Sequence, residues 1–207
     1  MLQRVLVWDV PTRVFHWLLA VSFAGAYLTA ESERYRDIHV ALGYLMFGLL
    51  LFRLVWGFAG TAYARFSSFL YAPSAVVTYV RSLFSQQPQH HVGHNPAGGV
   101  AIFLLLLLGL LISVSGLGLY WELGDEDWWE ELHEIAANLM LLVVLVHIAG
   151  VVVSSVLHKE NLPRSMVTGY KTAHADQGIA RPYAGLGLGM LGVVAVFLLV
   201  YLGGLTF

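Results

Sequence analysis

Long apolar stretches separated by short polar connections dominate the hydropathy pattern of this chain. A helix needs roughly 20 mostly apolar residues to cross a bilayer. Stretches of about this length predict membrane-spanning helices over residues 11–30, 38–59, 96–121, 129–157 and 184–205. We therefore expect an all-α integral membrane protein in which the fifth span follows a long polar connection.

Composition supports this expectation and removes several chemistries. Only 12% of the residues are charged, whereas soluble domains have about 25%. Membrane lipid, not nucleic acid, is therefore the expected surrounding. The chain has no cysteine, which excludes disulfides, thiolate metal sites and covalent c-type haem attachment.

The distribution of charge predicts an orientation. Arginine and lysine collect in the N-terminal segment and in the connections 60–95 and 158–183, whereas the connection 122–131 has six carboxylates and no basic residue. The positive-inside rule then places the N-terminus in the cytoplasm and the C-terminus outside. Because six carboxylates would attract a basic partner protein, we consider a docking role for this connection beside the simpler one of a solvated loop.

Smaller features predict local structure. Apolar residues recur at helical spacing in 73–85, which indicates an amphipathic helix on the cytoplasmic surface. The GxxxG step Gly185–Gly189 is expected to pack the fifth span against a neighbour. Tryptophans near the span ends are expected to act as interfacial anchors: Trp8, Trp17, Trp56, Trp121, Trp128 and Trp129.

Four histidines lie in or at the edge of the predicted spans: His16, His39, His133 and His147. Ionisable side chains are rare in such places and usually functional. His133 and His147 are 14 residues apart on one helix, which gives ~21 Å of depth and only ~40° of rotation. The charge-derived topology places His39 with His133 in the outer half, and His16 with His147 in the inner half.

Two imidazoles from facing helices are typical axial ligands of a b-type haem, and helix-bundle cores commonly hold such sites. Saturated axial positions favour electron transfer. The residues alone leave other readings open: zinc or copper binding, a histidine relay in a metal or proton transporter, a passive membrane anchor for a redox enzyme, or histidines that only pack.

Other polar residues have two readings each. Arg53, near the inner end of the second span, is expected either to pair with a haem propionate or to snorkel to the interface. His90, His91 and His94 fit a metal cluster or, more simply, a solvated loop and helix cap. A further group follows the fourth span and fits an inner-surface anchor or one wall of a quinone site: Lys159, Asn161 and Arg164.

Five segments together resemble the bacterial cytochrome b561 family, which includes the b-type cytochrome subunits of nickel–iron hydrogenases. They are WDVPTRVFHW around His16, DIHVALGY around His39, GHNPAGG at the opening of the third span, LHEIAANLM around His133, and LVHIAGVVVSSVLHKENLPRSMVTG around His147. The resemblance covers about residues 5–170, and the fifth span lies beyond it.

The resemblance implies a four-helix core, residues 1–170, with two b haems, followed by 171–207 as a linker and an additional helix. It assigns the inner haem to His16 and His147 and the outer one to His39 and His133, and it favours the propionate role of Arg53. It implies a bacterial inner-membrane protein that moves electrons between quinone and a periplasmic c-type cytochrome or hydrogenase-like subunit. Quinone oxidoreductase activity and a homodimer remain open expectations.

Overall fold

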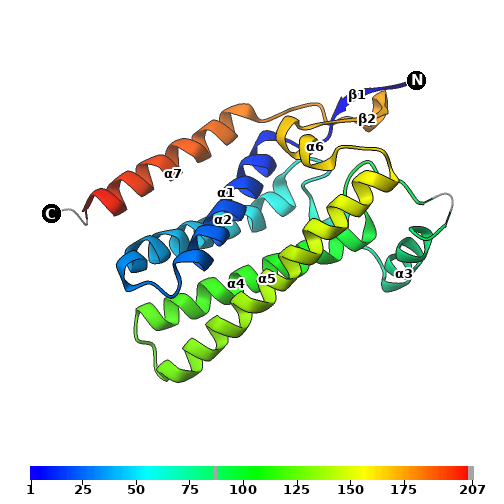
Figure 1. The fold of residues 1–207 in the computed structure, drawn as a ribbon. Helices are drawn as coiled ribbons and strands as arrows, with labels where there is room; N and C mark the ends of the chain where they lie inside the picture. Colours follow the sequence, from blue (N-terminus) through cyan, green and yellow to red (C-terminus); the bar gives the residue numbers. More distant parts are fainter. Residues whose placement is uncertain (86–87, 205–207) are drawn as a thin grey trace.

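The computed structural model describes residues 1–85 and 88–204 and is mostly helical (Figure 1). Its long helices run alternately in opposite directions and are α1 (Val10–Thr29), α2 (Arg36–Ala59), α4 (Pro96–Tyr120), α5 (Glu126–Leu157) and α7 (Ala184–Gly204). They start and end within three residues of the predicted spans; the predicted end at Leu205 lies outside the described residues. We call the end of the bundle with the short α1–α2 and α4–α5 connections the turn end, and the opposite end the strand end.

Side-chain caps explain where three long helices begin. Asp9 accepts a hydrogen bond from the backbone N–H of Thr12 at 2.7 Å, and Asn95 accepts one from Gly98 at 2.7 Å. Asp125 does the same for α5, as N-cap residues do. Much of the acidic connection predicted after the third span is therefore the first turns of α5, where carboxylates interact favourably with the helix dipole.

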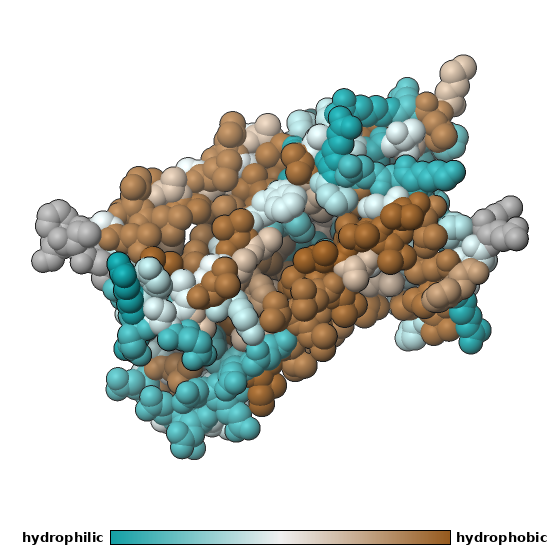
Figure 2. All heavy atoms as spheres, in the orientation of Figure 1, coloured by the Kyte–Doolittle hydropathy of each residue, from teal (hydrophilic) through white to brown (hydrophobic). Residues whose placement is uncertain are grey.

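Within the described residues, four helices are long and apolar enough to cross a membrane: Glu33–Ala59, which includes α2, and α4, α5 and α7. α1, with Arg13 and His16 in its 20 residues, is not among them, so the first span stays a prediction. Figure 2 shows apolar side chains over much of the outer surface. On α5, for example, Leu142, Val146 and Val152 are each more than half exposed. These features describe a multi-pass membrane protein.

The long helices form two pairs. α5 packs along α4 and α1 packs along α2, while α4 also contacts α2 and α7 lies against α1 and α2. In the described part of the chain, the contacts of α5 with α1 and α2 are sparse. Figure 2 shows a recess with hydrophilic colours between α5 and the helices above it. Of the four predicted site histidines, two come from α1 and α2 and two from α5. The pairs therefore join helices that have sparse contact with each other.

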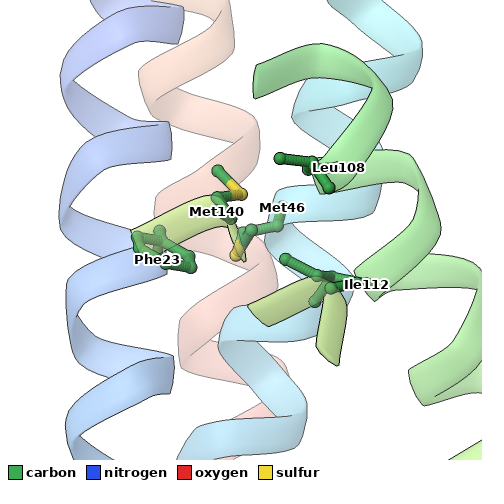
Figure 3. Packing of buried hydrophobic residues seen from close by; sticks show 6 residues of the cluster. Phe23, Met46, Leu108, Ile112 and Met140 are labelled. Atoms are coloured by element: carbon green, nitrogen blue, oxygen red, sulfur yellow. The ribbon is translucent and has the colours of Figure 1, made fainter. Parts of the chain in front are cut away.

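An apolar layer fills the middle of the bundle (Figure 3). It contains Phe23 from α1, Met46 from α2, Leu108 and Ile112 from α4, and Ala136 and Met140 from α5. Phe23 follows His16 by seven residues, Met46 follows His39 by seven, and Met140 lies midway between His133 and His147. The layer therefore sits about 10 Å along each helix from either histidine level.

Two short strands, which the hydropathy pattern does not predict, close the strand end. β1 (Leu2–Leu6) pairs antiparallel with β2 (Tyr170–His174), so that the N-terminus lies on the segment after α6 (Leu162–Thr168). Gly169, at φ 88°, ends α6 and accepts hydrogen bonds from the N–H groups of Val7 and Trp8. A Cβ there would lie 2.7 Å from the Trp8 carbonyl oxygen, so glycine is required. The domain boundary predicted at 170/171 falls inside β2 and stays a prediction.

The structure confirms one local prediction, the helix beginning at Pro73, and corrects two others, the GxxxG packing and part of the tryptophan anchors. The amphipathic segment is a helix, α3 (Pro73–Ser82), followed by the loop to α4. The GxxxG expectation is wrong in detail: a Cβ at Gly185 or Gly189 would meet nothing, whereas one at Gly187 would overlap Val10 of α1. The anchor role is wrong for two tryptophans that are buried inside the strand end, Trp8 and Trp56, whereas Trp17, Trp121 and Trp128 are exposed.

Candidate functional site: two histidine pairs

His39 of α2 and His133 of α5 meet at the turn end, with ring centroids 6.1 Å apart and planes at 65°. Each ring is held by a backbone carbonyl: His39 Nδ1 lies 2.9 Å from the Ala26 oxygen, and His133 Nδ1 lies 3.0 Å from the Ile112 oxygen. A carbonyl only accepts, so both Nδ1 atoms carry the proton. The lone pair is then on Nε2 of each ring, which is the form that binds a metal.

Small residues make room around this pair. A Cβ at Gly116 would lie 3.1 Å from Cε1 of His133, so a larger residue there would push the ring. Ser115, beside it, has its hydroxyl 3.1 Å from His133 Nδ1. Gly43, one turn after His39, faces open space, since an added Cβ would meet nothing within 4 Å. The turn-end rings are therefore positioned by the backbone with space beside them.

His16 of α1 and His147 of α5 lie toward the strand end and are near enough to interact electrostatically. Both are half-buried, and His16 Nδ1 is a buried atom without a hydrogen-bond partner. α1 and α5 make only sparse contact, so the two rings come from helices that are not packed along each other. This level also contains two residues whose environment the sequence did not predict, Arg53 and His94.

Arg53 is buried, with only 3% of its surface exposed, so the snorkelling reading is wrong. Its guanidinium lies over the ring of Phe66 at 4.8 Å, and Nη1 has no hydrogen-bond partner. Asp9, the acidic residue that acts on it electrostatically, accepts hydrogen bonds from Thr12 N, Trp56 Nε1 and Thr61 Oγ1. A buried guanidinium with an unpaired donor is suited to an anionic group.

His94 is not the solvated loop residue that the sequence suggested. It lies between the rings of Trp8 and Phe69, with both ring centroids at 4.6 Å. Burial, reinforced by the positive charge of Arg53 and Lys171 and by His147 and His16, lowers the pKa of His94 to about 3. His94 is therefore neutral at physiological pH. Its position just before the N-cap Asn95 was the only signal in the sequence, and it did not reveal the aromatic neighbours.

The remaining candidates do not form a metal site in the described part of the chain. Among the described residues, no group of three or more histidine, cysteine or carboxylate side chains is arranged to hold a metal, so the loop cluster of His90, His91 and His94 is not one. Asn161 caps α6 by accepting from the N–H of Arg164 at 2.8 Å. Lys159 occupies a turn with φ 52° and is exposed, as is Arg164. Both interpretations of that turn, an inner-surface anchor and one wall of a quinone site, stay predictions.

The fold and site define a multi-pass helical membrane protein with histidine pairs at two levels between its helices. The family model for prokaryotic cytochrome b561 matches residues 7–169, and the chain belongs to this family. It is therefore a membrane b-type cytochrome, and the family implies haem b and electron transfer.

Relatives of similar length support this assignment. The chain is 26% identical to a probable Ni/Fe-hydrogenase B-type cytochrome subunit of Rhizobium leguminosarum, covering 81% of this chain and 88% of that protein. It is 25% identical to the corresponding probable subunit of Azotobacter vinelandii (84% and 90% covered). The probable Ni/Fe-hydrogenase 1 subunit of Escherichia coli K12 is 21% identical (80% and 90% covered). No solved structure matches the chain.

Proposed function

We propose that this cytochrome holds two b haems, one between His39 and His133 and one between His16 and His147. The observation that carries the proposal is the turn-end geometry: both rings donate Nδ1–H to backbone carbonyls and keep Nε2 free. When bound, each haem would supply a one-electron iron couple, and two histidines holding it would leave no open position for oxygen. The protein holds the orientations of the histidine rings.

The spacing of the helices supports two cofactors. His133 and His147 are separated by ~21 Å along α5, and small or flexible residues, Ala136 and Met140, face inward between them. α5 stands off from α1 and α2, the two helices that supply the opposite ligands. At the strand end, the unpaired Nη1 of Arg53 is suited to hold a haem propionate.

We infer that electrons pass between quinone and a partner on the outer side of the bacterial inner membrane. The positive-inside rule places the strand end in the cytoplasm and the turn end outside, because the basic connections lie at the strand end. The relatives described above are named as probable Ni/Fe-hydrogenase subunits, which favours a hydrogenase-like partner. A periplasmic c-type cytochrome is the second candidate partner.

Exposed carboxylates at the turn end favour a basic partner surface. Glu122, Asp125, Glu126, Asp127, Glu130 and Glu131 are all exposed near the His39–His133 pair. Such a field raises association rates at low salt. The test is electron exchange with basic soluble cytochromes as a function of ionic strength, where rates should fall as salt increases. A rate that does not change with salt would remove this docking role.

The decisive experiment is haem quantitation in purified single variants. Replacing His16, His39, His133 or His147 by alanine should each lower the haem content from two per chain toward one, with a changed reduced-minus-oxidised spectrum. His174→Ala, on the exposed end of β2, is the matched control and should keep both haems. Unchanged haem content in any of the four variants would remove that residue from the ligand set.

A histidine-based metal or proton transporter is the alternative from another class. It predicts that the purified protein shows no haem absorption. It also predicts that the protein binds zinc or copper, or transports these ions or protons across a membrane. A passive membrane anchor predicts haem-free protein that still assembles with its partner. Absorption spectra and metal analysis of the same wild-type preparation separate these alternatives from the cytochrome.

A further inference from the structure

A second group of ionisable side chains lies at the strand end, outside the two histidine pairs. It joins three segments: the loop before α4, the α5–α6 turn and β2 (Figure 1). Glu160 is at its centre, with Oε1 3.2 Å from His90 Nε2 and Oε2 2.9 Å from Lys171 Nζ. The His158 ring lies 5.4 Å from that of His90.

The group leads from solvent into the protein. The side chain of His90 is 44% exposed, that of Glu160 is 19% exposed and that of Lys171 only 4%. Lys171 Nζ also lies 3.4 Å from the carbonyl oxygen of His91, the residue next to His90. The nearly buried ammonium of Lys171 thus contacts both the Glu160 carboxylate and the backbone carbonyl of His91. These contacts fix the order of the groups from the surface inward.

His91 is the inner member of this group. Its ring lies 5.6 Å from that of Tyr79 and 5.9 Å from that of Tyr71, and both His91 Nε2 and the Tyr79 hydroxyl are buried without a hydrogen-bond partner. Burial, with the neighbouring positive charge of His90, His158 and Lys171, lowers the pKa of His91. A neutral imidazole with an unengaged nitrogen both accepts and releases a proton.

Tyr71 connects His91 to the membrane-facing surface. Its ring lines an apolar hollow of about 240 Å³, together with Phe69, Pro96 and Phe103. Val100, Leu104 and Leu107 of α4 line the same hollow and are exposed on the apolar outer face, so it opens toward lipid. Tyr71 donates its hydroxyl to the His94 carbonyl at 3.0 Å, and Phe69 contacts both His94 and Arg53. The hollow therefore adjoins the strand-end level.

We propose that Glu160 and His91 carry protons between the aqueous phase at the strand end and a quinone headgroup in the hollow beside Tyr71. The inference rests on the proposed function, which supplies the quinone and the electrons. Reduction of one quinone to quinol takes up two electrons and two protons. Each proton enters at His90 and Glu160, passes to His91 and leaves it for a quinone oxygen; quinol oxidation runs the same path in reverse.

The test measures haem reduction in the purified, haem-loaded full-length protein after mixing with decylubiquinol or menadiol, and separately with dithionite. Glu160→Gln and His91→Ala should slow quinol-driven reduction by about ten-fold or more, since a positioned proton carrier contributes roughly 10²–10⁴-fold. Dithionite-driven reduction, haem content and haem potentials should not change. Added imidazole should restore part of the rate in His91→Ala. His174→Ala is the exposed control and should match wild type.

The outcomes separate the relay from the proposed function. If neither quinol reduces the wild-type haems, the quinone part of the proposed function fails and the relay fails with it. If wild type reacts and both variants react equally fast, the relay is overturned while quinone reactivity stands. If the variants lose haem, or slow equally with dithionite, or gain nothing from imidazole, the residues have only a structural role and the relay is again overturned.

Discussion

The two histidine levels of this bundle are built differently. At the turn end, His39 and His133 are oriented by carbonyls of α1 and α4, and the six carboxylates of residues 122–131, like Arg34 and Arg36, are exposed. At the strand end, His16 has an unpaired Nδ1 and the surroundings include the buried cations Arg53 and Lys171. One site is positioned by the backbone, and the other shares its half of the bundle with two buried cations and the carboxylates beside them, Asp9 and Glu160.

This difference indicates how one bundle sets two cofactor environments. Positive charge stabilises the reduced form of an iron couple, because reduction adds one electron to the site. The strand-end haem is therefore expected to have the higher potential, and the turn-end haem the lower one. Electrons arriving at the acidic outer surface then move downhill toward the strand end.

The largest effect is expected from Gly116→Leu, because even a Cβ would lie 3.1 Å from the ring of His133. The side chain should displace His133 and remove most of the turn-end haem while the strand-end haem stays bound. Haem quantitation and redox titration measure both. Gly48→Leu is the control, since Gly48 is exposed on α2 and a Cβ there meets nothing within 4 Å. Retention of two haems in Gly116→Leu would show that His133 does not need its present position.

Asp9→Ala should destabilise the strand end by about 3 kcal/mol. The variant removes an N-cap, worth ~1 kcal/mol, and leaves the buried donors of Trp56 and Thr61 unpaired, at about 1 kcal/mol or more each. Asp125→Ala, an exposed cap at the turn end, should cost only about 1 kcal/mol. Thermal unfolding in detergent compares them. Equal losses would contradict the contrast between a buried and an exposed cap.

Acid should weaken the folded protein partly through His94. Its folded pKa is about 3 against an ordinary 6.5, so between these values the unfolded chain binds more protons. The free energy of unfolding therefore falls as pH is lowered through this window, by up to about 1.4 kcal/mol per pH unit. Between roughly pH 6.5 and 5.5, the free energy of unfolding of His94→Leu should fall by about 1 kcal/mol less than that of wild type. His174→Leu, an exposed control, should behave as wild type; the same acid sensitivity in His94→Leu would refute the assignment.

Arg53→Met should have the smallest effect and the most specific one. Loss of a buried positive charge worth about 1 kcal/mol to the reduced state lowers a one-electron potential by roughly 40 mV. The shift should affect the strand-end haem and leave the turn-end haem in place. Spectroscopic redox titration resolves the two. Arg34→Gln is the control, because Arg34 is exposed at the turn end. If Arg53→Met shifts the potential of the turn-end haem instead, the assignment of the higher potential to the strand-end haem is wrong.

The sequence predicted those features that repeat along one helix. The five long helices follow from hydropathy, and the placement of His133 and His147 on the same face of one helix follows from 3.6 residues per turn. Features that join distant segments were missed. The short alternation in Leu2–Leu6 is too weak to predict β1, and nothing in Tyr170–His174 marks its partner. Likewise, the burial of Arg53 depends on Phe66 and Phe69, which reach it through a loop.

The pairing of β1 with β2 also sets an order of assembly during synthesis. Leu2 leaves the ribosome first but pairs with His174, which emerges only after α5 and α6. Contacts so distant in the chain form late. The turn-end level is complete once α5 has inserted, whereas the strand end stays open until β2 arrives. A nascent chain therefore offers its two levels to cofactor insertion at different times, the strand-end one last to be covered.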